Sequence, residues 1–233
     1  MMKINQKLAL AAVVLLTGRT ALAGSDNDAR KGDKPQSSPG WVVLEEDVFY
    51  PLRLDAAAIL HNADVHYRRG EEKAAANKIK QAISWLKFAA GHGYPETQKQ
   101  LQAAADDLGN LQVDLRNGNT VAASRMDATL AQAANALAMW HYFKAKDSLA
   151  KNELGYAAQD LQAAATYLQS AATSAHAEFG DEIVTLFRDV NHDGVAVDSG
   201  VSVEPNRLQS HLDAVKANLE NLAKTLAKIS HNA

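Results

Sequence analysis

The chain has 233 residues, of which 47% are hydrophobic, 22% charged and only 6% aromatic. Alanine supplies 44 residues and proline only five, and this composition favours long helices over β-sheet. The absence of cysteine excludes disulfide scaffolds, cysteine-ligated metal centres, thiol catalysis and lipoprotein acylation. With a net charge of −3, the chain has no excess positive charge to neutralise phosphates, so we expect no nucleic-acid partner.

Residues 1–23 have the pattern of a secretory signal peptide. Lys3 and Lys7 precede an apolar run over residues 8–16, and Ala21-Leu22-Ala23 fits the small-x-small cleavage pattern. The run is short for a spanning helix, which needs about 20 apolar residues. Cleavage would leave a mature chain with 21 basic and 27 acidic residues. We therefore expect an exported protein, periplasmic in a Gram-negative host and without stable membrane insertion, while an uncleaved anchor is the alternative.

The rest of the chain divides into a leader and one domain. Residues 24–40 (GSDNDARKGDKPQSSPG) are polar and contain two prolines, so they predict a disordered leader. Residues 41–233 predict a single all-α domain, an antiparallel bundle of about six helices. Its first helical pair is expected at 52–69 and 71–90, around Gly70.

Apolar residues then recur in steps of three and four, which keeps one stripe of each helix facing a partner. These stripes are Leu101, Ala104, Leu108, Leu111 and Leu115; Met126, Leu130, Ala133, Leu137 and Trp140; Leu154, Leu161 and Leu168; and Leu208, Leu212, Val215, Leu219, Leu222, Leu226 and Ile229. Turns are expected at 117–119 and 151–152. Alanines between the leucines of 154–172 predict close helix packing, with little room for a large buried cofactor.

Two patterns leave alternatives open. The apolar residues 41–44 could pair with the alternating residues 195–203 as a short two-stranded β element at one end of the bundle. The pair at 52–90 also matches the later helices at an offset of 82 residues. Either a duplication or the similarity of any two alanine-rich amphipathic helices explains that match.

The sequence at 189–194 (DVNHDG) is similar to the opening half of an EF-hand calcium loop. Oxygen ligands would come from Asp189, Asn191, Asp193 and the Val195 carbonyl, with Gly194 at the sharp turn. The position that should close the site with a bidentate acid is Gly200, so Asp198 would be an imperfect substitute. The segment therefore predicts either a weak calcium site or a polar turn after a short helix at 181–188.

Other metal sites and catalytic motifs have weaker support in the sequence. The eight histidines lack the spacing of a di-iron bundle, and the pairs His61 with Asp64 and His176 with Glu178 could bind copper or zinc adventitiously. Nucleophile-elbow and phosphate-loop motifs do not occur in the sequence, so we expect no enzyme. The aromatic residues at helical spacing are expected in the core.

The run at 43–52 (VLEEDVFYPL), followed by a helical hairpin that turns near residues 68–71, resembles the YfdX family of exported helical bacterial proteins. The resemblance covers residues 41–90. It implies a stress-associated, chaperone-like periplasmic role and brings no catalytic residues with it. We therefore expect a non-enzymatic protein that binds clients or partner helices and forms a homo-oligomer. The alternative is a carrier of a small ligand or of calcium.

Overall fold

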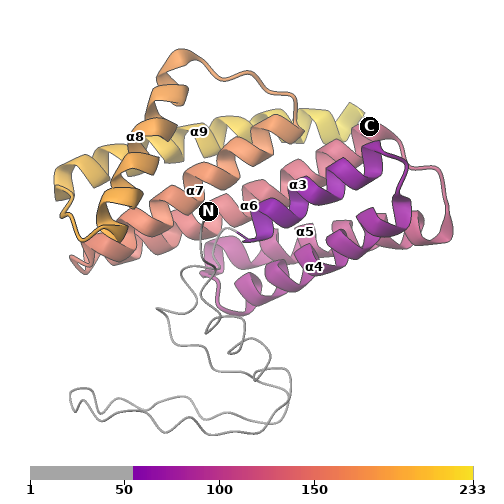
Figure 1. Cartoon of the computed structure of the whole chain (residues 1–233), viewed down its shortest axis with the longest axis horizontal. Coiled ribbons are helices and arrows are strands. Elements are labelled where there is room, and N and C mark those ends of the chain that lie inside the picture. Colours follow the sequence, from indigo (N-terminus) through magenta and orange to yellow (C-terminus); the bar gives the residue numbers. More distant parts are fainter. Residues whose placement is uncertain (1–54, 233) are drawn as a thin grey trace, which may run out of the picture. The chain divides into compact units, whose positions relative to one another are not determined.

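The computed structural model describes residues 55–232, which belong to one compact unit (Figure 1). The predicted signal peptide, the leader, the apolar run at 41–44 and the YfdX-like run at 43–52 lie outside the described residues. Within them the fold is all-α, a bundle of seven helices where about six were expected. None of these helices is both long and apolar enough to cross a membrane.

The helices follow one another through short connections. They are α3 (Asp55–Arg68), α4 (Glu72–Gly91), α5 (Pro95–Asn117), α6 (Ala123–Ala150), α7 (Leu154–Ser174), α8 (Asp181–Asp198) and α9 (Pro205–Asn232). The helix α5 begins with Pro95, where a missing N–H costs little, and ends before Gly118 in the left-handed conformation (φ 70°). The predicted turns at 117–119 and 151–152 are therefore confirmed.

Helix α6 lies at the centre of the bundle. It packs against α3, α4, α5, α7 and α9, and 17 of its 28 residues are buried. Figure 1 shows α9 along one side of the α6–α7 pair, with α3, α4 and α5 along the other. Helix α4 contacts α3 and α5 and reaches α6 only slightly, so it forms an outer edge of the bundle.

The predicted apolar stripes form the core. All five stripe residues of α5 are buried, as are the five of α6. In α7, Leu161 and Leu168 are buried together with the alanines between them, and α6 and α7 make the most extensive helix contact in the described chain. Alanine allows this close approach because its side chain is small. Of the aromatic residues expected in the core, Trp140, Tyr142 and Tyr167 are buried, whereas Trp85 and Phe143 are half-buried.

Helix α8 differs from the prediction. The sequence suggested a helix over 181–188 followed by a loop, whereas α8 continues through the DVNHDG segment to Asp198. Asparagine, aspartate and glycine are weak helix formers, but packing on α7 outweighs this local preference. The predicted β pairing is wrong for residues 195–197 because they are helical, and no strand occurs among residues 55–232.

Candidate functional site

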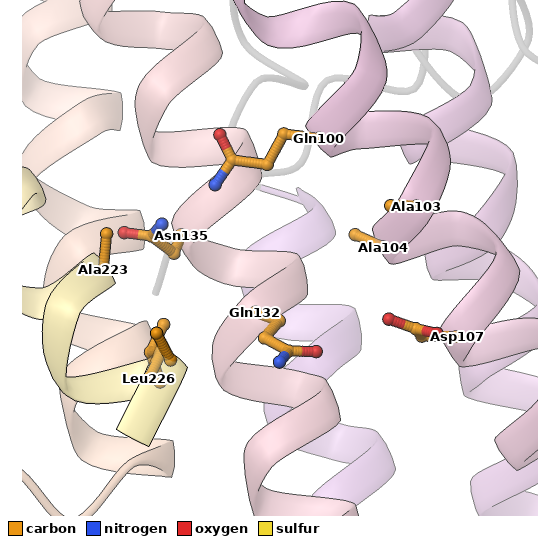
Figure 2. Close-up of a pocket in the computed structure, with 9 residues that line it drawn as sticks. Gln100, Ala103, Ala104, Asp107, Gln132, Asn135, Ala223 and Leu226 are labelled. Carbon is orange, nitrogen blue, oxygen red and sulfur yellow. The ribbon is translucent and has the colours of Figure 1, made fainter. Parts of the chain in front are cut away.

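A groove opens over α6, between α5 on one side and α9 on the other (Figure 2). Its volume is about 270 Å³. It is lined by Gln100, Ala103, Ala104 and Asp107 from α5, Gln132 and Asn135 from α6, and Ala223, Leu226 and Ala227 from α9. The α9 wall is therefore apolar, the α5 wall carries Gln100 and Asp107 beside two alanines, and the floor carries two side-chain amides.

Asn135 is the unusual residue of this groove. Only 2% of its surface is exposed, and its side-chain oxygen is buried without a hydrogen-bond partner among the described residues. Figure 2 shows this oxygen turned toward Ala223. A buried polar atom left without a partner costs about 1–3 kcal/mol. An acceptor without a partner among the described residues therefore lies beside the groove, under its α9 wall next to Ala223.

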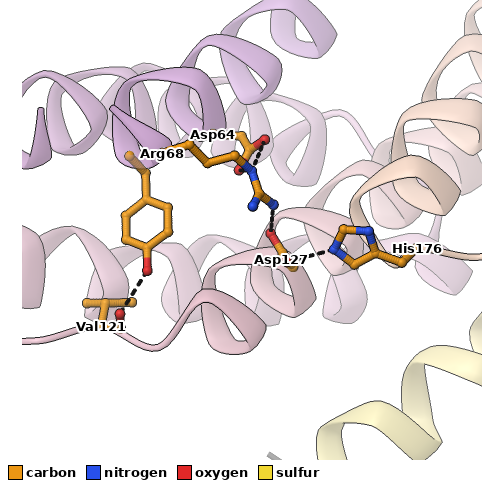
Figure 3. A network of polar contacts seen from close by, with 6 residues as sticks. Asp64, Arg68, Val121, Asp127 and His176 are labelled. Carbon is orange, nitrogen blue, oxygen red and sulfur yellow. Dashed lines mark hydrogen bonds and ion pairs between the residues drawn. The ribbon is translucent and has the colours of Figure 1, made fainter. Parts of the chain in front are cut away.

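A second site lies where α3, α6 and the end of α7 meet (Figure 3). The Arg68 guanidinium donates to Asp64 of its own helix at 3.0 Å and to Asp127 of α6 at 2.7 Å. His176 Nε2 lies 2.9 Å from the other oxygen of Asp127. Hydrogen bonding to Asp64, with the charge of Asp127, raises the pKa of Arg68 above its ordinary value. Arg68 is therefore held as a cation between two carboxylates.

This network borders a polar cleft of about 560 Å³ between α3 and α7. Its wall on α3 carries His61, Asp64 and Arg68, and its α7 side carries hydroxyl and amide groups that lead to His176. The two histidines that the sequence analysis singled out as metal ligands thus line one cleft. Among residues 55–232, however, no group of three or more histidines and carboxylates is placed to hold a metal ion.

A further cleft of about 420 Å³ lies between α7 and α8. It shares Thr166 and Gln169 with the polar cleft, and its α8 side combines Val184 and Phe187 with the polar Arg188 and Asn191. Phe179 and Phe187 pack edge to face there, with ring centroids 5.1 Å apart. The outer surface of α7 therefore separates a polar cleft from a partly aromatic one.

Three carboxylates are buried in the described part of the chain, and each contacts a histidine and a permanent cation. They are Asp127 with Arg68 and His176, Asp160 with His141 and Lys144, and Asp193 with Arg207 and His211. Each cluster joins at least two helices. Paired in this way, a buried carboxylate fixes which helices meet, because removing its partner would leave an uncompensated charge.

The deepest of these clusters lies within the α6–α7 contact. His141 Nδ1 is 2.7 Å from Asp160 Oδ1, and both side chains are at most 1% exposed. Lys144 Nζ is 3.5 Å from the same oxygen. The His141 ring stacks on Tyr167, with centroids 5.5 Å apart. This cluster lines none of the three clefts described above, so we assign it a structural role.

The residues predicted as calcium ligands do not converge. In a helix, Asp189 and Asp193 share one face, whereas Asn191 points about 200° away. Asn191 accepts a hydrogen bond from Gln162 at 2.7 Å, Asp193 from Arg207 at 2.7 Å, and Asp198 from Gln159. The Val195 carbonyl accepts from the Ser199 backbone. These residues are therefore helical rather than a loop, and their oxygens serve helix contacts, while calcium binding itself stays a prediction.

Gly194 lies within helix α8 and does not form the predicted turn. A Cβ atom at this position would lie 2.5 Å from Gln162 Oε1, so glycine lets α8 approach α7 closely. Together with Asp193, it is one of only four buried residues on α8. The motif that resembled a metal loop is thus a helix-docking motif.

At the α4–α5 connection, Tyr94 lies against the far end of α6. Its hydroxyl donates to Asp147 at 3.3 Å, and its ring lies 5.8 Å from that of Phe143. Burial, with the nearby charge of Asp147, raises the pKa of Tyr94 to about 12. A hydrogen bond from Lys151 lowers the pKa of Asp147. These groups tie α5 to α6 at the end opposite Arg68.

The sequence analysis did not identify the groove or its central residue. Asn135 is an asparagine in an otherwise apolar and alanine-rich stretch of α6, and that contrast was the available signal. Gln132 lies one turn before it on the same face. Arg68 and His176 lie 59 and 49 residues from Asp127 along the sequence. No local sequence pattern could therefore predict that they pair with it.

Comparisons with protein families, characterised proteins and solved structures found no match for this chain. The YfdX resemblance of residues 41–90 therefore stays a prediction.

Proposed function

We propose that this chain is an exported, periplasmic and non-enzymatic protein that binds other polypeptides under stress, in the manner of a chaperone. Its binding site is the groove between α5 and α9. The ligand that fits is an amphipathic helix from a client or partner. The YfdX resemblance and the predicted signal peptide point in the same direction.

The observation that carries this proposal is the unpartnered side-chain oxygen of Asn135 at the floor of the groove. A purely apolar ligand would leave it unsatisfied. A helix that presents a serine, threonine, asparagine or glutamine among apolar residues would supply the donor. The groove therefore favours an amphipathic ligand with one polar group in its apolar stripe.

The walls of the groove support a helical ligand. Both walls carry small side chains, namely Ala103 and Ala104 on α5 and Ala223 and Ala227 on α9. A helix from another polypeptide could therefore approach α6 closely. Both walls run antiparallel to α6, which gives the groove the direction of a helix axis. This arrangement is the helix-in-groove mode of recognition.

Aggregation of a heat-labile client in the presence of equimolar mature chain tests the proposal. We expect the wild-type chain to suppress light scattering by the client. Ala223→Arg, which places a long charged side chain in the groove, should abolish most of the suppression. Ala217→Arg is the matched control, since Ala217 is exposed on the same helix and does not line the groove.

Both variants should melt at the wild-type temperature, because a loss of suppression then reflects the groove and not unfolding of the chain. Equal suppression by both variants would show that the groove is not the binding site. Failure of the wild-type chain to suppress aggregation would contradict the chaperone-like role itself.

Self-association is part of the proposal, because a helix from a second copy is one ligand of the required kind. We expect light scattering to show a homo-oligomer that Ala223→Arg dissociates. A wild-type chain that is monomeric at all concentrations would restrict the groove to other partners.

The polar cleft between α3 and α7 favours a second candidate function, a carrier of a small polar ligand. Its histidines, hydroxyl groups and the Arg68 network could bind a ligand rich in hydrogen-bonding groups. Thermal-shift screening against sugars, amino acids and polyols tests this candidate. A ligand that raises the melting temperature of the wild-type chain but not of His61→Ala would support it.

A further inference from the structure

The outer face of α4 carries an unusual concentration of positive charge. Within the chain's overall net charge of −3, this single helix contains Lys73, Lys78, Lys80 and Lys87 but only one acid, Glu72. Within residues 55–232, none of these lysines lies within ion-pair distance of a carboxylate. Most of the other buried and half-buried charges described above are paired. Among residues 55–232 these lysines therefore have no carboxylate partner, an arrangement that favours contact with an anionic surface.

The lysines form a straight row. Lys73, Lys80 and Lys87 are all exposed and recur every seven residues, which places them about 10.5 Å apart along one side of the helix. Arg116 of α5 lies beside this row, where it donates to Asn77 of α4 at 3.3 Å. We name the row with Arg116 the basic face. It lies on the outer edge of the bundle, on a helix that packs mainly against α3 and α5 among the described helices.

Apolar side chains lie among the charges. Phe88 is 38% exposed on α4, and Val113 is 54% exposed on α5. Trp85 packs edge to face with Phe88, at a centroid distance of 6.1 Å. Aromatic side chains next to lysines are typical of surfaces that lie against a membrane, where the rings sit at headgroup level and the amines reach the phosphates.

We propose that the basic face of α4 adsorbs the protein onto an anionic lipid surface without insertion. The apolar stripe of α4 is already buried in the bundle, at Ile79, Ala82 and Leu86 among others, so it is not available to enter the bilayer. The attraction is therefore electrostatic, with Phe88 as a shallow apolar contact. This surface is separate from the groove over α6, and the two proposals stand independently.

The chemistry of the face favours lipid over other polyanions. Lysine is a hydrated point charge suited to a continuous layer of headgroups, whereas specific carboxylate recognition by a protein uses the arginine fork. The Phe88 ring lies between Trp85 and the His92 ring, whose centroid is 4.4 Å away. The His92 ring therefore covers one side of Phe88, which disfavours stacking of a nucleic-acid base on that side.

Vesicle co-sedimentation of the full chain tests this proposal. We expect binding to vesicles of equal parts phosphatidylglycerol and phosphatidylcholine, loss of binding in high salt, and little binding to pure phosphatidylcholine. The triple variant Lys73→Gln, Lys80→Gln, Lys87→Gln should bind about 100-fold more weakly, since each lysine near an anionic surface contributes about a factor of five.

The matched control is Lys216→Gln, Lys224→Gln, Lys228→Gln on α9, which removes the same charge from exposed positions of a helix that does not pack on α4. It should bind nearly as well as the wild-type chain. Equal loss in both triple variants, or equal binding to both kinds of vesicle, would overturn the assignment to the basic face. Binding to polyglutamate or single-stranded DNA without binding to anionic vesicles would overturn the choice of lipid. Unchanged melting of both variants is checked first.

Discussion

The contact between α6 and α7 and the contact between α7 and α8 are built in different ways. Alanines and leucines line most of the first, and His141 and Asp160 of its charged cluster are fully buried. The second buries only four residues of α8 and relies on side-chain amides, with Gln162 and Gln159 of α7 bonded to Asn191 and Asp198. The centre of this bundle is therefore held by close apolar packing around a buried charged cluster, and its edge by side-chain amides and one glycine.

The largest expected effect comes from the charge buried in the α6–α7 contact. Asp160→Ala would leave His141 and Lys144 in the core without their carboxylate, and breaking a buried pair costs about 3–5 kcal/mol. We expect a large fall in the free energy of unfolding, measured by urea denaturation. A change below about 1 kcal/mol would show that the α6–α7 contact does not depend on this cluster.

The next effect separates the edge from the centre. Gly194→Ala would place a Cβ atom within 3.0 Å of three atoms of Gln162, so it should destabilise the protein by about 2 kcal/mol. Gly109→Ala is the control, because nothing lies within 4 Å of a Cβ at that position of α5. Helix propensity predicts that this control gains about 0.5–1 kcal/mol. Opposite signs in urea denaturation would confirm that Gly194 is required for docking.

The apolar stripes could be predicted from the sequence, whereas the structure of the DVNHDG segment could not. The stripes of α5, α6, α7 and α9 could be predicted because a long run of leucine and alanine at helical spacing leaves few alternative structures. The DVNHDG segment could not, because its local preference for a turn is outweighed by contacts with Gln162 and Arg207 from other helices. Those partners lie 14 to 29 residues away, so no local pattern reports them.

The groove could not be predicted from the sequence either, because it also depends on contacts between distant helices. A groove exists where two helices flank a third without meeting, and this depends on the order of packing around α6. The sequence could have drawn attention to Asn135 as a polar residue in an apolar stretch, but not to the helices beside it. By contrast, the lysine row of α4 was fully visible in the sequence, and only the structure showed that it lies on an outer edge.

The smallest effect is a pH dependence at the α5–α6 junction. The pKa of Tyr94 is raised to about 12, from about 10 in an unfolded chain, so its contribution to stability is complete below pH 10 and lost as the pH rises through 12. The contact of α8 with α9 should persist over this range, because bonding to Asp193 raises the pKa of Arg207. Hydrogen exchange at alkaline pH should therefore show opening near Tyr94 before α8. Tyr94→Phe should remove this difference, and simultaneous opening in the wild-type chain would contradict it.

The most direct test of the central claim is to map a bound helix onto the protein by nuclear magnetic resonance. The isotope-labelled mature chain is titrated with a synthetic amphipathic helix that carries one serine in its apolar stripe. We predict that the shifted signals cluster at the groove, at Asn135 and its side-chain amide, at Ala104 and at Ala223. Shifts confined to α4 or α8, or no shifts at saturating peptide, would contradict the claim that the groove over α6 is the binding site.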